Sequence, residues 1–194
     1  LLNLPHIFQT SLSSIPSQLP YFYVPSEIPI PPHLSVPETP GGLSIGIVWS
    51  SNPDNKRMYV NKSIPFNLLF EVLNPLVELD LINLHSLQVG SDSKCVLPYL
   101  KEGRVFDWSC DITDFSDTAY LISQLDLVIS IDTAVAHLSA ALKCPTWLLL
   151  PYDSDFRWLC DRHDSPWYPK IIRLFRQSIF DDWTSVTDEL QAAL

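Results

Sequence analysis

From Gly42 onward, short apolar runs alternate with helical patterns, and this alternation is the feature that most constrains the fold. The expected strands are 43–49, 80–87, a weak one at 104–107, 127–130 and 146–150, with 171–175 as a sixth strand at the edge. The expected helices are 66–73, 117–124, 133–142 and 183–194. Such an order predicts an α/β fold, a Rossmann-like parallel sheet with helices on both faces. Ligands of such sheets bind beyond the carboxyl ends of the strands.

The first 41 residues differ from the rest because nine of the 17 prolines precede Gly41. This density disfavours long helices and favours extended chain, and 28–32 should be polyproline-like or irregular. We expect two parts: 1–41 as a linker or the remnant of an N-terminal domain, and 42–194 as the globular domain. The proline-rich part is either a flexible tail or an ordered strap. Because the chain begins without Met, we expect a fragment or a processed protein.

Charge and cysteine content limit the possible partners. Acidic residues outnumber basic ones by 22 to 12, and the basic residues do not cluster, so we expect no nucleic-acid partner. The longest apolar runs, such as 146–150, are too short for a transmembrane segment. The four cysteines have no metal-ligand spacing, and we expect reduced, mostly buried thiols in a cytoplasmic protein without a metal or other cofactor. An anionic small molecule remains compatible with the acidic chain.

The segment 126–151 is the most informative one. A buried strand leads directly into Asp132 and Thr133, which are both favourable helix N-caps, and a helix follows. The backbone amides of Thr133, Ala134 and Val135 should then face out of the sheet edge and form an anion site. His137, one turn further, either reaches a bound phosphate or only bonds nearby protein groups.

Three other segments follow expected strands. Ser50 and Ser51 precede a polar loop with Lys56, Arg57 and Lys62, which suits a phosphate but also describes a solvated loop. Gln88 is placed to bond a ribose or a base edge. The segment 152–169 is rich in aromatic and charged residues and suits the wall of a ligand cleft, unless Trp158 and Trp167 only pack it onto the sheet. The sequence contains no glycine-rich dinucleotide or P-loop motif, no nucleophile elbow and no HExxH pair.

Residues 130–137, with Pro145 and Pro151 downstream, resemble the C-terminal domain of glycosyltransferase family 9, which includes the ADP-heptose:lipopolysaccharide heptosyltransferases. The similarity is greater to family-9-like domains that follow tetratricopeptide repeats in bacterial proteins. Those domains carry segments similar to 48–53, 86–88, 164–169 and 174–177.

The resemblance implies the C-terminal half of a GT-B fold that binds a nucleotide-diphospho-sugar donor and catalyses inverting, metal-independent hexosyl or heptosyl transfer. It implies donor-binding roles for Ser50, Ser51, Gln88, Asp132, Thr133, Ala134, Val135 and His137. Lys62 would stabilise the leaving diphosphate. The family has Gly at the position of Ala134, and the alanine side chain leaves less room for a phosphate. Its catalytic base lies in the N-terminal domain, so no base is named, and a missing N-terminal acceptor domain or repeat region is an expected partner.

Two other functions compete with this one. The second hypothesis is a non-catalytic module, derived from such a transferase, that binds nucleotide or other proteins. The third hypothesis is a nucleotide-sugar epimerase of the same architecture. Such an enzyme requires carboxylates and histidines from a complete two-domain cleft.

Overall fold

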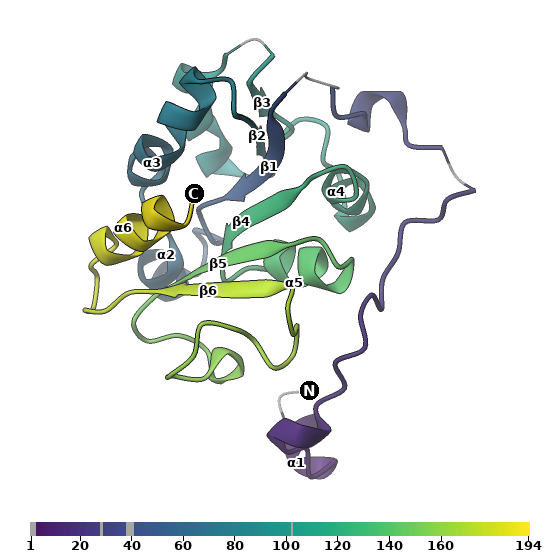
Figure 1. Ribbon diagram of the computed structural model, residues 1–194, viewed down its shortest axis with the longest axis vertical. Coiled ribbons are helices and arrows are strands. Elements are labelled where there is room, and N and C mark those ends of the chain that lie inside the picture. The colour runs from purple at the N-terminus through teal and green to yellow at the C-terminus, as the bar shows by residue number, and fades with distance from the viewer. Residues whose placement is uncertain (1–2, 28, 38–40, 102) are drawn as a thin grey trace.

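The computed structural model describes residues 3–27, 29–37, 41–101 and 103–194. In this part of the chain, six parallel strands form one sheet in the order β3-β2-β1-β4-β5-β6 (Figure 1). Their bounds are β1 Leu43–Val48, β2 Ile82–Ser86, β3 Val105–Asp107, β4 Leu127–Ile131, β5 Thr146–Leu150 and β6 Ile172–Arg176. The predicted Rossmann-like sheet is confirmed, and so is its sixth strand.

The helices cover both faces of the sheet. They are α1 Leu4–Ile7, α2 Lys56–Lys62, α3 Phe66–Glu78, α4 Phe115–Ile122, α5 Ala134–Ala141 and α6 Thr184–Ala193. Short 3-10 segments occur at η1 Leu12–Ser14, η2 Pro32–Leu34, η3 Ser91–Tyr99 and η4 Phe156–Trp158. Figure 1 shows α3 and α6 on one side of the sheet and α4 and α5 on the other.

Strand β1 shows how the two cores form. Ile45 and Ile47 pack in the core beneath α3 and α6, whereas Val48 packs with α4 residues on the opposite face. Successive strand side chains point to opposite faces, and here both faces are apolar because helices cover both. The sheet is therefore buried on both sides, and its strand ends are where polar groups can gather.

Helix α3 is longer than predicted. The predicted helix ends at Leu73, yet the helix continues through Pro75 to Glu78. Proline removes one backbone hydrogen bond. Leu69, Leu73 and Val77 are each 0% exposed, so packing of this apolar stripe onto the sheet outweighs that loss.

The proline-rich segment contacts the domain at two points. Tyr21 N donates to Ala141 O at 3.1 Å at the end of α5. Further on, Leu34 is fully buried, and Gln124 Nε2 donates to Leu34 O at 2.9 Å. In the predicted irregular run, residue 28 lies outside the described residues, 29–31 have no regular structure, and Pro32 begins η2. The contacts favour a strap over a free tail (Figure 1).

The cysteines correct one expectation. All four are free, but only Cys144 is buried, and burial raises the pKa of its thiol to about 11. Cys95, Cys110 and Cys160 are exposed, because η3 and the segments after β3 and β5 lie at the surface.

No helix in the described ranges combines the length and apolar character needed to cross a membrane.

Candidate functional site

The main cavity lies where the strand order reverses. From β1 the chain proceeds to β2 on one side, and β4 returns to the other side of β1, which leaves a crevice at their carboxyl ends. A cavity of about 550 Å³ occupies this place. Eight of the residues predicted to serve the site line it: Ser50, Ser51, Lys62, Gln88, Asp132, Thr133, Ala134 and Val135. His137 does not line it.

A short ion pair stands in this cavity. Lys62 Nζ lies 2.6 Å from Asp132 Oδ2, and the side chains are 18% and 5% exposed. Lys62 ends α2, whereas Asp132 directly follows β4, so the pair joins two elements that are far apart in sequence. Poor solvent access strengthens the attraction of each charge for a ligand, and it also makes loss of either partner costly. The pair places one cation beside the first turn of α5.

The prediction that Lys56, Arg57 and Lys62 lie in a polar loop is wrong. These residues belong to α2, which begins after Asn55, whose Oδ1 accepts from Met58 N at 3.3 Å. The helix points Lys62 toward Asp132 and leaves Lys56 and Arg57 outside the main cavity. The signal that was missed is the Asn55 cap three residues before Met58.

The first turn of α5 has no side-chain cap. Thr133 occupies the N-cap position, but its side chain bonds no helix amide, and its Oγ1 lies 3.3 Å from Ser130 Oγ. Asp132 does not cap either, because its carboxylate contacts Lys62. The expected capping by these two side chains is therefore wrong. The start of the helix lies open on the cavity, where Ala134 and Val135 also line the wall.

The two serines belong to a network that sequence analysis did not foresee. The Ser50 hydroxyl donates to the carboxylate of Asp92, and Tyr59 OH donates to Asp92 Oδ2 at 2.8 Å. This bond raises the pKa of Tyr59. Ser51 N donates to Ser63 Oγ at 3.1 Å, while its own buried hydroxyl has no partner among the described residues. Asp92 also lines the cavity. Asp92 lies in η3, and no local sequence pattern distinguishes it from an ordinary surface acid.

Gln88 stabilises the floor of the cavity through hydrogen bonds to the backbone. Its Oε1 accepts from Trp49 N at 3.2 Å and from Ser50 N at 2.9 Å, and its Nε2 donates to Val89 O at 3.1 Å. These bonds tie the end of β1 to the segment after β2. The side chain is 5% exposed, so it holds the shape of the site in addition to lining it.

His137 lies behind the ion pair. Its Nδ1 is 2.9 Å from Tyr168 OH, its ring stacks on Trp158 at 5.2 Å, and its Nε2 is 3.8 Å from Asp132 Oδ1. Burial lowers the pKa of His137, although the nearby Asp132 opposes this. Tyr21 OH lies 3.1 Å from Tyr168 OH, so His137 belongs to a series of polar groups that runs from the N-terminal segment to Asp132.

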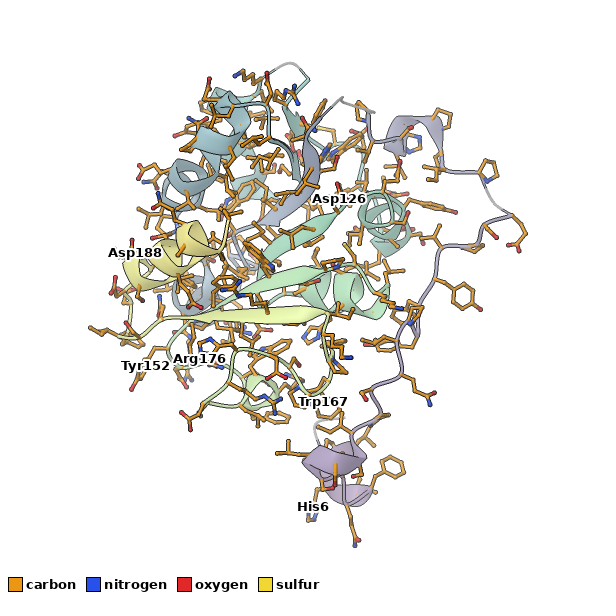
Figure 2. All side chains as sticks on the ribbon, in the orientation of Figure 1. His6, Asp126, Tyr152, Trp167, Arg176 and Asp188 are labelled. Carbon is orange, nitrogen blue, oxygen red and sulfur yellow. The ribbon has the colours of Figure 1, made fainter. Side chains whose placement is uncertain are left out.

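The aromatic loop after β5 does not form the wall of the main cavity, which corrects that expectation. None of 152–169 lines it. Trp158 is fully buried in the core formed by α5 and the strands β5 and β6, and Trp167 packs against the same core (Figure 2). The alternative, that these rings fasten the loop onto the sheet, is confirmed.

Comparison with known proteins gives a family match over part of the chain and a similar fold over most of it. Residues 110–153 match the model of glycosyltransferase family 9 (heptosyltransferase), a span that includes β4, α5 and β5. No curated protein matches the sequence of this chain.

Solved heptosyltransferases have a similar structure. The E. coli heptosyltransferase WaaC with ADP superposes with a TM-score of 0.57 at 16% identity, covering 81% of this chain and 46% of that one. The E. coli ADP-heptose LPS heptosyltransferase II gives 0.56 at 17%, covering 79% and 47%. A family 9 glycosyltransferase from Veillonella parvula DSM 2008 gives 0.57 at 15%, covering 80% and 46%.

This chain thus spans about half the length of the structures that it matches. It shares the α/β fold of one half of the heptosyltransferases, and its residues 110–153 carry the sequence pattern of glycosyltransferase family 9.

Proposed function

We propose that this chain is the nucleotide-diphospho-sugar-binding domain of an inverting, metal-independent glycosyltransferase. It would be the C-terminal half of a GT-B fold, and residues 1–41 would be the end of the preceding domain and its linker. That domain would supply the catalytic base and bind the acceptor. By the resemblance of its segments, we place the whole protein among bacterial, cytoplasmic transferases whose N-terminal part carries tetratricopeptide repeats.

The observation that carries the proposal is the meeting of Lys62 with the open start of α5 at one cavity. A diphosphate needs a cation and several N–H donors at the same place. The Lys62 ammonium and the cavity-lining residues Thr133 to Val135 offer both. The solved WaaC structures with ADP and with ADP-2-deoxy-2-fluoro heptose indicate which ligands to test first.

The proposed chemical role of this domain is to stabilise the leaving group. When the bond between the sugar and the diphosphate breaks, negative charge grows on the departing oxygen. Lys62 and the amides of α5 would stabilise that charge, which is greatest in the transition state. Asp132 would hold Lys62 in place before the donor arrives, and His137 would support Asp132 from behind. Lys62 would thus supply the positive charge that a metal ion supplies in other transferases.

Calorimetric titration with ADP, UDP, GDP and ADP-heptose tests the donor site, each in the presence of EDTA. We expect one nucleotide to bind saturably, though weakly for a single domain. Lys62→Gln should weaken that binding at least tenfold, which corresponds to about 1.4 kcal/mol. Asp132→Asn should weaken it less, because its role is to position Lys62.

Lys170→Gln is the matched control, because Lys170 is exposed and lies outside the cavity. It should leave nucleotide affinity unchanged. Equal binding by wild type and Lys62→Gln would contradict the proposed site. A different result would favour the non-catalytic module: the complete protein binds nucleotide, and a variant that lacks Lys62 keeps its normal biological activity.

A further inference from the structure

Helix α2 carries Lys62, yet it does not pack on the hydrophobic core. None of its seven residues is buried, and none belongs to a core cluster of the described residues. Met58 and Lys62 line the main cavity, and Tyr59 lines a smaller one of about 260 Å³. The others line a second cavity of about 470 Å³ on another side of the helix: Lys56, Arg57, Val60 and Asn61. Hydrophobic burial therefore does little to fix the orientation of α2.

The chain is attached to the sheet directly after α2. Ile64 N donates to Trp49 O at 3.0 Å, and Ser51 N donates to Ser63 Oγ at 3.1 Å. Both bonds lie at one end of the helix, so they leave its axis free to pivot about that end. The direction in which Lys62 points therefore depends on the contacts that the side chains of α2 make.

Two side chains of α2 besides Lys62 form hydrogen bonds to distant parts of the described chain. Tyr59 OH donates to Asp92 Oδ2 at 2.8 Å, whereas Asn61 Nδ2 donates to Asp153 O at 3.4 Å. The Tyr59 bond is the stronger of the two, because it is shorter and its acceptor is charged. Tyr59 is therefore the main contact of α2 outside the ion pair of Lys62.

Asp92 is itself fixed by other hydrogen bonds. It lies in η3, its carboxylate accepts from the Ser50 hydroxyl beyond β1, and its Oδ1 accepts from Ser91 Oγ at 3.2 Å. Tyr59 lies three residues before Lys62, and residues three apart on a helix share a face. The bond from Tyr59 thus ties the face of α2 that carries Lys62 to a carboxylate held at the edge of the sheet.

We propose that Tyr59 and Asp92 are positioning residues for Lys62. Their hydrogen bond fixes the orientation of α2, and that orientation directs the Lys62 ammonium to Asp132 and to the main cavity. An ammonium that is ordered before its ligand arrives loses less conformational freedom on binding. The inference rests on the proposed function in one respect: the ligand that meets this ammonium is the diphosphate of the donor.

Hydrogen exchange of the Lys62 ammonium group tests the positioning without any ligand. In 15N-edited nuclear magnetic resonance spectra of the lysine side chains, Lys62→Gln identifies the Lys62 signal by its loss. An ammonium held in an ion pair exchanges its hydrogens with water more slowly than a free one. Tyr59→Phe should therefore raise the exchange rate about threefold, the equivalent of one modest hydrogen bond. The domain should stay folded, because α2 has no buried residue.

Tyr152→Phe is the matched control, because Tyr152 is 57% exposed and lines neither the main cavity nor the smaller one. It should leave the exchange rate of Lys62 unchanged. Asp92→Asn should raise this rate in the wild-type background but not in the Tyr59→Phe background, because Asp92 acts through the Tyr59 hydroxyl. An exchange rate that Tyr59→Phe leaves unchanged would overturn the proposal. A further increase on adding Asp92→Asn would contradict the route through Tyr59.

Titration of the same variants with ADP, UDP and GDP separates this inference from the proposed function. Tyr59→Phe should weaken binding of the preferred nucleotide about threefold in the wild-type background and not at all in the Lys62→Gln background. Equal losses in both backgrounds would show a role independent of Lys62 and overturn the proposal. If the exchange rate rises as expected but no nucleotide binds, the positioning stands and the donor function fails. If nucleotide binds but Tyr59→Phe changes neither quantity, the donor site stands and the positioning fails.

Discussion

Two regions of the molecule hold a histidine against a tryptophan, and they differ in what faces the second ring nitrogen. At the β2–β3 edge, His85 stacks on Phe106 at 4.9 Å and accepts from Trp108 Nε1 at 3.2 Å. Beside α5, His137 stacks on Trp158 and bonds Tyr168. The Nε2 of His85 has no partner among the described residues, whereas the Nε2 of His137 approaches Asp132.

This difference separates a structural histidine from one that can serve a site. His85 is 1% exposed, and burial lowers its pKa to about 4. The pKa of His137 is also lowered by burial, but Asp132 acts against that effect. The Asp132 carboxylate lies 3.8 Å from His137 Nε2 and connects this histidine to the cavity. His85 has no such connection and contributes packing.

Acid should destabilise the protein mainly through His85. Between pH 6.5 and about 4 the unfolded chain binds a proton at this residue and the folded chain does not. Stability is therefore complete above pH 6.5, falls as the pH decreases, and loses up to about 3 kcal/mol by pH 4. Denaturant titrations across this range should show a shallower loss for His85→Phe than for wild type. Parallel curves for the two proteins would show that His85 is not the titrating group.

The two tryptophans should respond unequally to replacement by phenylalanine. Trp108→Phe removes the donor to His85 and leaves a buried ring nitrogen unpaired, which costs about 1–3 kcal/mol beyond the lost volume. Trp158 Nε1 has no partner among the described residues, so Trp158→Phe loses volume alone. Unfolding in denaturant at pH 7 measures both. Equal losses of unfolding free energy in the two variants would contradict the difference in hydrogen bonding between these two tryptophans.

Only one of the histidines should affect nucleotide binding. His137→Gln removes the imidazole behind Asp132, and we expect nucleotide affinity to fall about fivefold, the equivalent of one modest hydrogen bond. His85→Phe should not change it, because His85 lies outside the cavity. Calorimetric titration of both variants compares them directly. A larger effect from His85→Phe would reverse the assignment.

The strap should make the smallest contribution. Tyr21→Phe deletes the hydroxyl that donates to Tyr168, and we expect a loss of about 0.5–1 kcal/mol with unchanged nucleotide affinity. Tyr23→Phe is the matched control, because Tyr23 is 79% exposed. Thermal unfolding of the two variants gives the difference. A marked loss of nucleotide binding in Tyr21→Phe would mean that the strap sets the geometry of the site.

Much of the site followed from local sequence. Ser50, Gln88 and Asp132 each stand just after an apolar strand, and parallel strands end at one edge of a sheet, so their side chains had to come near one another. The role of Lys62 follows from the resemblance alone, and the composition of its segment predicts a loop where the structure has α2. The α2 cap at Asn55 is too short a signal to outweigh the polar composition of that segment.

Asp92 and Tyr168 were missed for another reason. Each acts through a partner distant in sequence: Asp92 through Ser50 and Tyr59, and Tyr168 through His137 and Tyr21. Neither has a local pattern that distinguishes it from an ordinary surface acid or a packed tyrosine. Side-chain pairs of this kind depend on how elements pack, which one sequence does not encode locally.

The sequence by itself determined the α/β class, the six strands, and the sheet edge at which polar groups gather, because hydrophobic periodicity and turn residues act over short distances. Only the tertiary structure decided that Lys62 pairs with Asp132, that His137 and His85 differ in what their second nitrogen meets, and that α2 separates two cavities. Those features arise when burial brings distant side chains together and removes the water that would otherwise pair with them.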